Sequence, residues 1–530
     1  MGDTSSKALS LTPADATRLA EAGISKEMVE HQLRMFAQGI RHRFVVRPAT
    51  VGDGIRRLTE AEAAALAEAY ETAQREKEIL TFIPASGAAS RMFFALDAFL
   101  LGPCSRGELK AKGERDAGAH DVSTFFDELD RFAFFETLKA SLERDGLSLA
   151  KALTDQDALT AIVEHLLDDK GLGFRDLPKG LIPFHRYADG ARTAFEEHLV
   201  EASSYGRGGD ERVRILFTVA PERLKLFESA LAQAKTSHRS AHAMPEVTFT
   251  CQKSSTNTVA VGEDGLPFRD DEGRMILRAG GHGALIENLA EIEADVVFVK
   301  NIDNVAIESQ SSLSTQWKRV LGGALCSIQG QIFGFLRELE EGVPSAPRLS
   351  TIEAFVRRDL GTEPPEGFET WSSDGRRAYL KQKLHRPLRI AGMVKNEGEP
   401  GGGPFWVRSD AGVSLQIVES SEIDTSKPEQ KDVLQRATHF NPVDLVLGLR
   451  DHRGEKYDLR QYVNREAYFI SRKSSGGKTL RALELPGLWN GAMSDWNTVF
   501  VEVPSATFCP VKKLVDLLRP QHTEETTSST

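Results

Sequence analysis

The sequence has few cysteines and no long apolar run. Its four cysteines are far apart and form no Cys-x-x-Cys pair, so neither a disulfide framework nor a zinc site is indicated, and we expect buried thiols. No apolar stretch approaches the roughly 18–20 residues that cross a bilayer, and the polar first residues lack the apolar core of a signal peptide. We therefore expect a cytoplasmic protein without a membrane partner.

Positive charge is also in deficit. The 530 residues contain 66 Lys and Arg against 77 Asp and Glu, which gives a formal net charge of −11. A protein that binds nucleic acid by releasing counterions needs an excess of positive charge, so no nucleic-acid partner is expected. The charged fraction of 27% is ordinary for a globular protein, and the length allows two or three domains.

Apolar runs separated by helical patterns predict an α/β core. Residues 1–75 have helical patterns, including the capping box Thr59-x-x-Glu62, and are predicted as a helical N-terminal extension. Strands spaced by helices predict a mixed, mainly parallel sheet that binds ligands at the carboxyl ends of its strands. The apolar runs that carry this prediction lie at 79–85, 213–219, 246–251 and 295–302.

In the last third of the chain, Gly and Pro interrupt the helical pattern more often. Gly- and Pro-rich stretches past residue 340, with five glycines within 392–403, indicate a boundary or a lid. The predicted division is a helical extension (1–75), an α/β core (76–390), a C-terminal α+β segment (391–519) and a disordered tail (520–530).

A turn of small residues follows the first predicted core strand. Ala85, Ser86, Gly87 and Ala88 lie between that strand and an amphipathic segment that begins at Arg91. Backbone N–H groups and a positive helix end at such a turn can hold a phosphate chain, and Arg91 supplies a forked cation. The alternative is a tight packing turn that binds nothing.

Three later segments place polar groups where ligands commonly bind. Lys179 stands between two prolines, although a single lysine in a rigid loop is more often a surface lysine. The loop Gly281-His282-Gly283 runs into a predicted helix, where it can meet a ligand or merely satisfy positive φ with His282 as a cap. Asp303 follows the apolar run 295–302, where a carboxylate suits Mg²⁺ or caps the next element.

In this order, the segments resemble the motifs of nucleotide-sugar pyrophosphorylases, specifically the UDP-sugar branch. The turn 85–92 is similar to the superfamily's G-x-G-T-x-[ML] loop, and Pro178-Lys179 with Pro183 is similar to its P-K-x-x-x-P step. Gly281-His282-Gly283 resembles its G-[HN]-G loop over the base and ribose.

Three more segments extend the resemblance. Gln252 falls where the family carries a glutamine that recognises uracil. The segment 298–304 resembles the strand end F-x-x-N-x-D-N, whose aspartate, Asp303 here, binds the metal. Near the carboxyl end, 508–518 resembles the element F-x-P-V-K-x-x-x-D-L-L, whose lysine, Lys512 here, reaches the phosphates.

The resemblance implies a Rossmann-like nucleotidyltransferase core whose C-terminal segment completes the sugar-phosphate side. The implied reaction joins a nucleoside triphosphate, expected to be UTP, to a sugar 1-phosphate or a similar phosphorylated small molecule and releases pyrophosphate. Arg91 would hold the pyrophosphate, Lys179 and Lys512 the sugar phosphate and α-phosphate, and Asp303 the cofactor Mg²⁺.

One departure supports an alternative. The wording of the segments 84–92, 280–289 and 484–504 also resembles a bacterial family recorded as domain of unknown function 4301, which would span nearly the whole chain but whose label gives no activity. In the first loop, the paired glycines of the pyrophosphorylases are replaced by Ala85-Ser86 and Ala88-Ala89. Side chains there would crowd a triphosphate, so the alternative is a non-catalytic nucleotide or nucleotide-sugar binding or sensor protein on the same fold.

Two structural expectations concern the proposed cations and the metal ligand. An apolar helical face within 511–518 predicts that Lys512 and Lys513 project from a helix, one towards a pocket shared with Arg91, Lys179 and Asp303 and the other towards solvent. The alternative is that both lysines only solvate a terminal helix. Asp303, at a strand's carboxyl end, is expected to lie outside the core.

Overall fold

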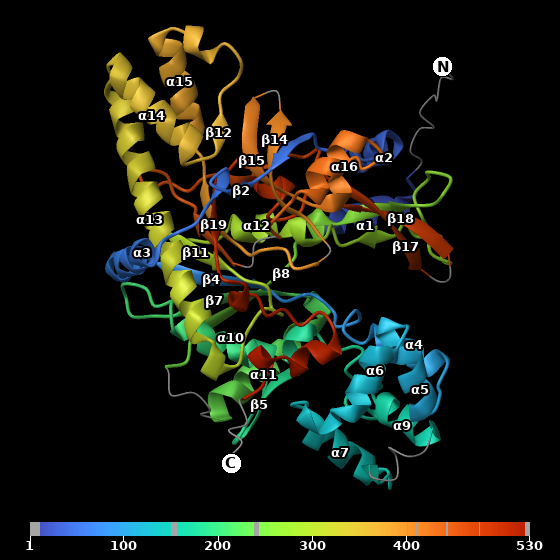
Figure 1. The fold of residues 1–530 in the computed structure, drawn as a ribbon. Coiled ribbons are helices and arrows are strands. Elements are labelled where there is room, and N and C mark those ends of the chain that lie inside the picture. Colours follow the sequence, from blue (N-terminus) through green and yellow to red (C-terminus); the bar gives the residue numbers. More distant parts are fainter. Residues whose placement is uncertain are drawn as a thin grey trace. The chain divides into compact units, whose positions relative to one another are not determined.

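The computed structural model describes residues 11–149, 156–237, 243–399, 401–409, 411–440, 444–475 and 478–524. The chain divides into two compact units, each assembled from three separate segments (Figure 1). The first unit comprises Met1–Ala63, Cys251–Val297 and Leu321–Val503, and the second comprises Ala64–Thr250, Phe298–Val320 and Pro504–Thr530.

The fold is α/β, and its largest sheet is mixed, mainly parallel and nine-stranded, as the sequence predicts. In the first unit, neighbouring strands follow the order β2 (Thr50–Val51), β3 (Gly54–Arg56), β19 (Asn497–Glu502), β13 (Leu388–Met393) and β16 (Asp444–Gly448). In the second unit, the order is β4 (Ile79–Pro84), β7 (Arg214–Val219) and β8 (Glu246–Cys251). β11 (Val296–Val299) and the long helix α13 (Ser312–Glu341) contribute residues to both units.

Smaller sheets complete each unit. One sheet of the first unit has the order β1 (Val45–Pro48), β14 (Gly403–Ser409), β15 (Gly412–Val418) and β12 (Thr362–Glu363). Another has the order β10 (Leu277–Arg278), β9 (Thr258–Val261), β18 (Lys478–Glu484) and β17 (Phe469–Ser475). The second unit has the hairpin of β5 (Pro183–Tyr187) and β6 (Gly190–Thr193).

Helices accompany the sheets in both units. Those of the first unit are α1 (Pro13–Ala22), α2 (Lys26–Gln38), α12 (Ile286–Leu289), α14 (Ala346–Arg358), α15 (Ser373–Leu384) and α16 (Pro428–Gln435). Those of the second are α3 (Glu60–Ala73), α4 (Phe94–Leu101), α5 (Arg106–Gly113), α6 (Ala117–Asp127), α7 (Phe135–Arg144), α9 (Gln156–Leu167), α10 (Ala194–Ser203) and α11 (Leu224–Ser237).

Local sequence signals explain several of these elements. Thr12 and Asp15 form a capping box that starts α1, and Glu62 accepts a hydrogen bond from the Thr59 backbone N–H at the start of α3. β4 alternates little and is nearly buried throughout, as expected of a strand within a parallel sheet. Residues 45–56 also form three short strands that the helical pattern of the first 75 residues did not indicate.

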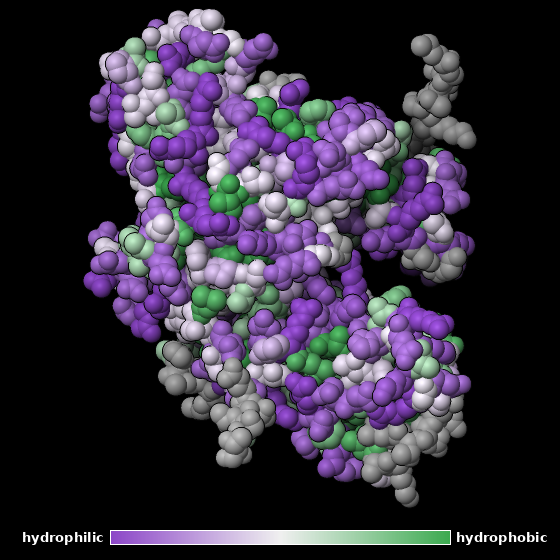
Figure 2. Space-filling model, viewed as in Figure 1, coloured by the Kyte–Doolittle hydropathy of each residue, from purple (hydrophilic) through white to green (hydrophobic). Residues whose placement is uncertain are grey.

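One apolar core of the second unit lies among α4, α5, α6, α7 and α9, which are grouped together in Figure 1. Leucines and phenylalanines make up most of it, and the Phe125 ring lies 5.1 Å from that of Phe126 and 5.6 Å from that of Phe132, tilted against both. The same cluster includes Val511 and Leu514, which fastens the end of the chain to these helices. On the surface, apolar residues form separate patches among hydrophilic ones in the view of Figure 2.

Two expectations need correction. None of the four cysteines forms a disulfide, but only Cys104 and Cys509 are buried, while Cys251 and Cys326 are half-buried. The expected tail begins too early, because Pro520–His522 forms a 3-10 turn in which His522 is 2% exposed and contacts His185; residues 525–530 lie outside the described residues. Among the described helices, none is long and apolar enough to cross a membrane.

Candidate functional site

The small-residue turn follows β4 in the second unit, as predicted. Ala85 is buried and its N–H donates to the Thr218 carbonyl oxygen at 2.7 Å, whereas Ser86, Gly87 and Ala88 are exposed. α4 begins only at Phe94, after a separate turn. The exposed backbone is thus available to a ligand, but the N-terminal N–H groups of α4 do not directly follow Ala88.

Two segments that are distant in sequence form backbone hydrogen bonds with this turn and with the residues that follow it. The Lys179 N–H donates to the Gly87 carbonyl oxygen at 3.2 Å. On the other side, the Leu514 N–H donates to the Met92 carbonyl oxygen at 3.2 Å. Gly180 packs closely next to Lys179, because a Cβ there would lie 3.0 Å from the Ile302 side chain. Backbone contacts thus bring the turn, the Pro-Lys-Gly step and the C-terminal segment together.

The centre of this arrangement is the Asp303 carboxylate. Its Oδ2 accepts from Lys179 Nζ at 2.6 Å and from Lys512 Nζ at 3.2 Å. The Val511 N–H donates to the Asp303 carbonyl oxygen at 3.0 Å, which holds the C-terminal segment in place. The predicted proximity of Lys512, Lys179 and Asp303 is therefore confirmed, while their chemical roles stay predictions.

Burial makes these charges unequal. The Asp303 side chain is 12% exposed and that of Lys179 is 13% exposed, but that of Lys512 is 61% exposed. Burial alone would raise the pKa of Asp303, but the neighbouring Lys179 and Lys512 outweigh it and lower that pKa below its ordinary value. Burial lowers the pKa of Lys179, and Asp303 opposes the change only in part. Two ammonium groups thus share one oxygen of the Asp303 carboxylate.

The expectation that Asp303 lies outside the core is wrong. The residue is 8% exposed, because its segment passes under the C-terminal chain and is fixed at several points. Asn304 Oδ1 accepts from the Cys509 N–H at 2.9 Å, and His198 Nε2 donates to the Ile302 carbonyl oxygen at 3.1 Å. A strand end is buried here because a later segment covers it.

A second cluster of charged side chains, which the motifs did not indicate, includes Lys300, three residues before Asp303. Glu201 of α10 accepts from Lys300 Nζ at 2.8 and 2.9 Å and from Lys318 Nζ at 3.0 Å, with all three side chains at most 4% exposed. Burial would raise the pKa of Glu201, but the two lysines outweigh it and lower that pKa. Burial and the charge of Lys300 lower the pKa of His198 to about 4, so that imidazole is neutral. In the sequence, the one indication of this cluster is Lys300, a lysine at the end of a predicted apolar strand.

The side chains around Asp303 offer few free oxygen atoms to a Mg²⁺ ion. That ion needs oxygen ligands at about 2.0–2.1 Å. Asp303 Oδ2 is already shared by two ammonium groups, which would repel a dication at that oxygen. Asp516 accepts from the N–H groups of Lys512 and Lys513 and pairs with Arg519. These side chains alone therefore do not fit a resident Mg²⁺ ion, and the assignment of Asp303 as its ligand stays a prediction.

The C-terminal segment departs from the predicted helix. Leu514–Leu518 is a 3-10 helix, and Lys513 precedes it in an extended conformation, because the Asp516 carboxylate caps both preceding N–H groups. Lys513 does not face solvent alone but pairs with Asp121 of α6 at 2.9 Å. The two lysines still diverge, Lys512 towards Asp303 and Lys513 towards α6.

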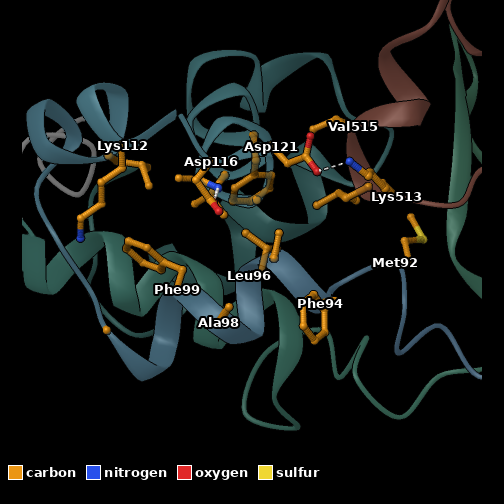
Figure 3. Close-up of a pocket in the computed structure, with 18 of the residues that line it drawn as sticks. Met92, Phe94, Leu96, Ala98, Phe99, Lys112, Asp116, Asp121, Lys513 and Val515 are labelled. Atoms are coloured by element: carbon orange, nitrogen blue, oxygen red, sulfur yellow. Dashed lines mark hydrogen bonds and ion pairs between the residues drawn. The ribbon is translucent and has the colours of Figure 1, made fainter. Parts of the chain in front are cut away.

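Arg91 lies on the wall of a pocket of about 440 Å³ in the second unit, together with Met92 and Lys513. Figure 3 shows the apolar side chains of Phe94, Leu96 and Phe99 on the same pocket, with the Asp121–Lys513 pair at one end. Arg91 itself is exposed. The pocket and the Asp303 cluster share the segment that carries Lys512 and Lys513.

The residues predicted to recognise the base belong to the first unit. Gln252 is half-buried, and its Nε2 donates to Thr256 Oγ1 at 3.1 Å. A pocket of about 190 Å³ is lined by Thr256, Asn257 and Gly283, among others. Gln252 is therefore one hydrogen bond away from that pocket through Thr256.

Packing accounts for the glycines of the loop Gly281-His282-Gly283. Gly281 has a φ of +79°, and a Cβ on Gly283 would lie 2.0 Å from the Pro486 carbonyl oxygen. His282 Nδ1 accepts from the Leu488 N–H at 3.1 Å, and its ring lies 5.2 Å from that of Trp489. The glycines thus have a structural reason to be there, and His282 is held as the tautomer that leaves its proton on Nε2.

The model of a family described as Domain of unknown function (DUF4301) matches residues 12–523. No curated protein matches the sequence. Solved structures with a similar fold include a UDP-glucose pyrophosphorylase variant from Leishmania major in complex with UDP-glucose, at 13% identity and a TM-score of 0.42, covering 96% of this chain and 79% of that one. A UDP-glucose phosphorylase from Trypanosoma brucei is similar at 11% identity and a TM-score of 0.45, covering 95% and 77%.

Proposed function

The chain belongs to the DUF4301 family, and we propose that it is a nucleotidyltransferase that makes a nucleotide sugar from a nucleoside triphosphate and a sugar 1-phosphate. In the proposed reaction, a phosphate oxygen of the sugar 1-phosphate attacks the α-phosphorus of the triphosphate. The bond from the α-phosphorus to the oxygen that bridges to the β-phosphorus breaks, and pyrophosphate leaves with that oxygen. UTP is the proposed nucleotide.

The observation that carries the proposal is the convergence of Lys179 and Lys512 on Asp303. The transfer needs alignment of two phosphates and cations that hold the charge developing on them. Lys179 is fixed by its backbone contact with Gly87, and Lys512 by the neighbouring contact of Val511 with Asp303. Both ammonium groups therefore lie near the exposed turn after β4, where they would hold the α-phosphate and the sugar phosphate.

The other site residues receive roles that follow from their chemistry. Asp303 keeps Lys179 and Lys512 in position and stays ionised, because its pKa is lowered. Arg91, exposed beside Lys513, would hold the leaving pyrophosphate with its forked guanidinium. Gln252 and Gly281-His282-Gly283 would bind the base and ribose. The proposed cofactor, Mg²⁺, would supply further neutralisation of phosphate charge when bound with substrate; Lys179 and Lys512 already share Asp303 Oδ2, so that oxygen is not its ligand in this arrangement.

A non-catalytic nucleotide or nucleotide-sugar binder is the second candidate, and the turn after β4 favours it. Ala88 is exposed at the surface that a triphosphate would approach, where the related motif has glycine. Gly87 leaves open space, since a Cβ there would have nothing within 4 Å. Replacing Ala88 by glycine tests the crowding directly: the variant should turn over faster if the alanine obstructs an active enzyme.

Calorimetry with the full chain tests the nucleotide assignment. UTP or a UDP-sugar should bind in preference to ATP, and Gln252→Ala should weaken the uridine nucleotide about tenfold by removing one hydrogen bond. Gln233→Ala, at an exposed glutamine of α11, is the matched control and should bind like the parent. Equal binding of adenine and uridine nucleotides would remove Gln252 from the base site.

A further inference from the structure

A group of metal-ligating side chains lies in the first unit, away from any residue assigned above. His385 follows the last residue of α15, and Asp451 and His452 lie in the turn after β16. One ligand atom from each of the three lies within 4.8 Å of the other two. Two imidazoles and one carboxylate form a donor set that suits transition-metal dications better than Mg²⁺ or Ca²⁺.

The ring of His452 is held with one nitrogen free for a ligand. Its Nε2 donates to Glu340 Oε2 at 3.0 Å. Its Nδ1 is buried and has no hydrogen-bond partner, in a side chain that is only 3% exposed. A buried ring nitrogen without a partner is costly, and an imidazole whose other N–H binds a carboxylate is the usual arrangement of a metal-bound histidine.

Glu340 is itself fixed as the supporting carboxylate. Its Oε1 pairs with Arg453 at 2.9 Å and with Lys381 at 3.2 Å. Held between Arg453 and Lys381, the Glu340 carboxylate accepts the hydrogen bond from His452 Nε2. This leaves the lone pair of His452 on Nδ1.

The remaining two ligand atoms already have a suitable separation. His385 Nε2 lies 3.3 Å from Asp451 Oδ2. Zinc bonds of about 2.0–2.1 Å in a tetrahedral site place neighbouring ligand atoms roughly 3.3 Å apart. Asp451 Oδ1 accepts from the N–H groups of Arg453 and Glu455, which fixes the carboxylate with Oδ2 turned to His385. The His385 side chain is 43% exposed, so it can adjust and admit an ion from solvent.

From this geometry we propose that His385, Asp451 and His452 bind one transition-metal dication of the Zn²⁺ type, with Glu340 as the carboxylate that orients His452. Three protein ligands leave a fourth position for water. The ion would tie together the end of α13, the end of α15 and the turn after β16, all within the first unit. This site is independent of the proposed nucleotidyltransferase reaction.

The test uses the full chain after treatment with a chelator. Co²⁺ is titrated in while its visible absorption is followed, and Zn²⁺ is then added to displace it. One equivalent of Co²⁺ per chain should bind and give the intense absorption of a four- or five-coordinate site. His385→Ala and Asp451→Asn should each weaken binding at least tenfold, and Glu340→Gln should weaken it about 10–100-fold.

The controls separate a specific site from surface binding and from misfolding. His120→Ala removes an exposed histidine outside the group and should bind like the parent. His385 is partly exposed, so His385→Ala is expected to keep its circular dichroism and melting temperature without metal. Binding of less than a tenth of an equivalent by the parent, or unchanged binding by a folded His385→Ala, would overturn the proposal.

Discussion

Replacing the Asp303 carboxylate tests how much the buried ion pair with Lys179 contributes to the free energy of unfolding. Asp303→Asn leaves Lys179, 13% exposed, without its partner. Losing one member of a buried ion pair costs about 3–5 kcal/mol, and we expect about 3 kcal/mol because Lys512 can turn to solvent. Lys512→Ala removes a partner that is 61% exposed and should cost less than about 1 kcal/mol.

Urea unfolding at neutral pH measures both variants, with an unchanged slope required for comparison. The double variant Asp303→Asn with Lys179→Met removes both charges and should regain most of the lost stability. The pKa of Asp303 is lowered on folding, so its stabilising effect is present above the ordinary Asp pKa of about 3.9 and is lost as the pH falls through the folded value. If Asp303→Asn is no less stable than Lys512→Ala, the buried pair is not what holds this segment.

Three further predictions follow from other contacts. Burial lowers the pKa of Lys179, so this lysine loses its charge, and nucleotide binding should weaken, at a lower pH than for an exposed lysine. Lys179→Arg should retain binding at that pH, which calorimetric titrations over a pH series measure. Glu201→Gln removes the buried carboxylate charge that Lys300 and Lys318 share and should lower stability by about 3 kcal/mol in urea unfolding, whereas Glu228→Gln, at an exposed site on α11, should change it by less than about 0.5 kcal/mol; equal effects would refute the role of the cluster. Gly283→Ala places a Cβ 2.0 Å from the Pro486 carbonyl oxygen and should lower stability by about 2 kcal/mol, while Gly87→Ala, in open space, should melt like the parent.

Local patterns predicted the elements that carry the site. The apolar run at 79–85 is β4 and that at 295–302 contains β11, since short β-rich runs bounded by polar residues leave little choice of conformation. The order of the motifs also predicted that Lys179, Asp303 and Lys512 lie close together, as they do. Resemblance to known motifs, rather than periodicity, supplied that long-range information.

Features that depend on distant segments were not predictable in the same way. The strands at 45–56 have weak local patterns and form because β14 and β19 offer partners. The 3-10 helix at Leu514–Leu518 has an α-like apolar pattern, but the Asp516 carboxylate caps the preceding N–H groups. His385 precedes Asp451 by 66 positions and His452 by 67, so no local spacing indicated this group, which only the fold brings together.

The most direct test of the proposed reaction measures pyrophosphate release. The purified chain is incubated with UTP, Mg²⁺ and each of a series of sugar 1-phosphates, beside the double variant Lys179→Ala with Lys512→Ala. We expect release of pyrophosphate and of a matching amount of UDP-sugar with at least one acceptor, and loss of at least 100-fold in the double variant as two phosphate contacts are removed. Nucleotide binding without pyrophosphate release from any acceptor would contradict the catalytic proposal and leave the binding protein in its place.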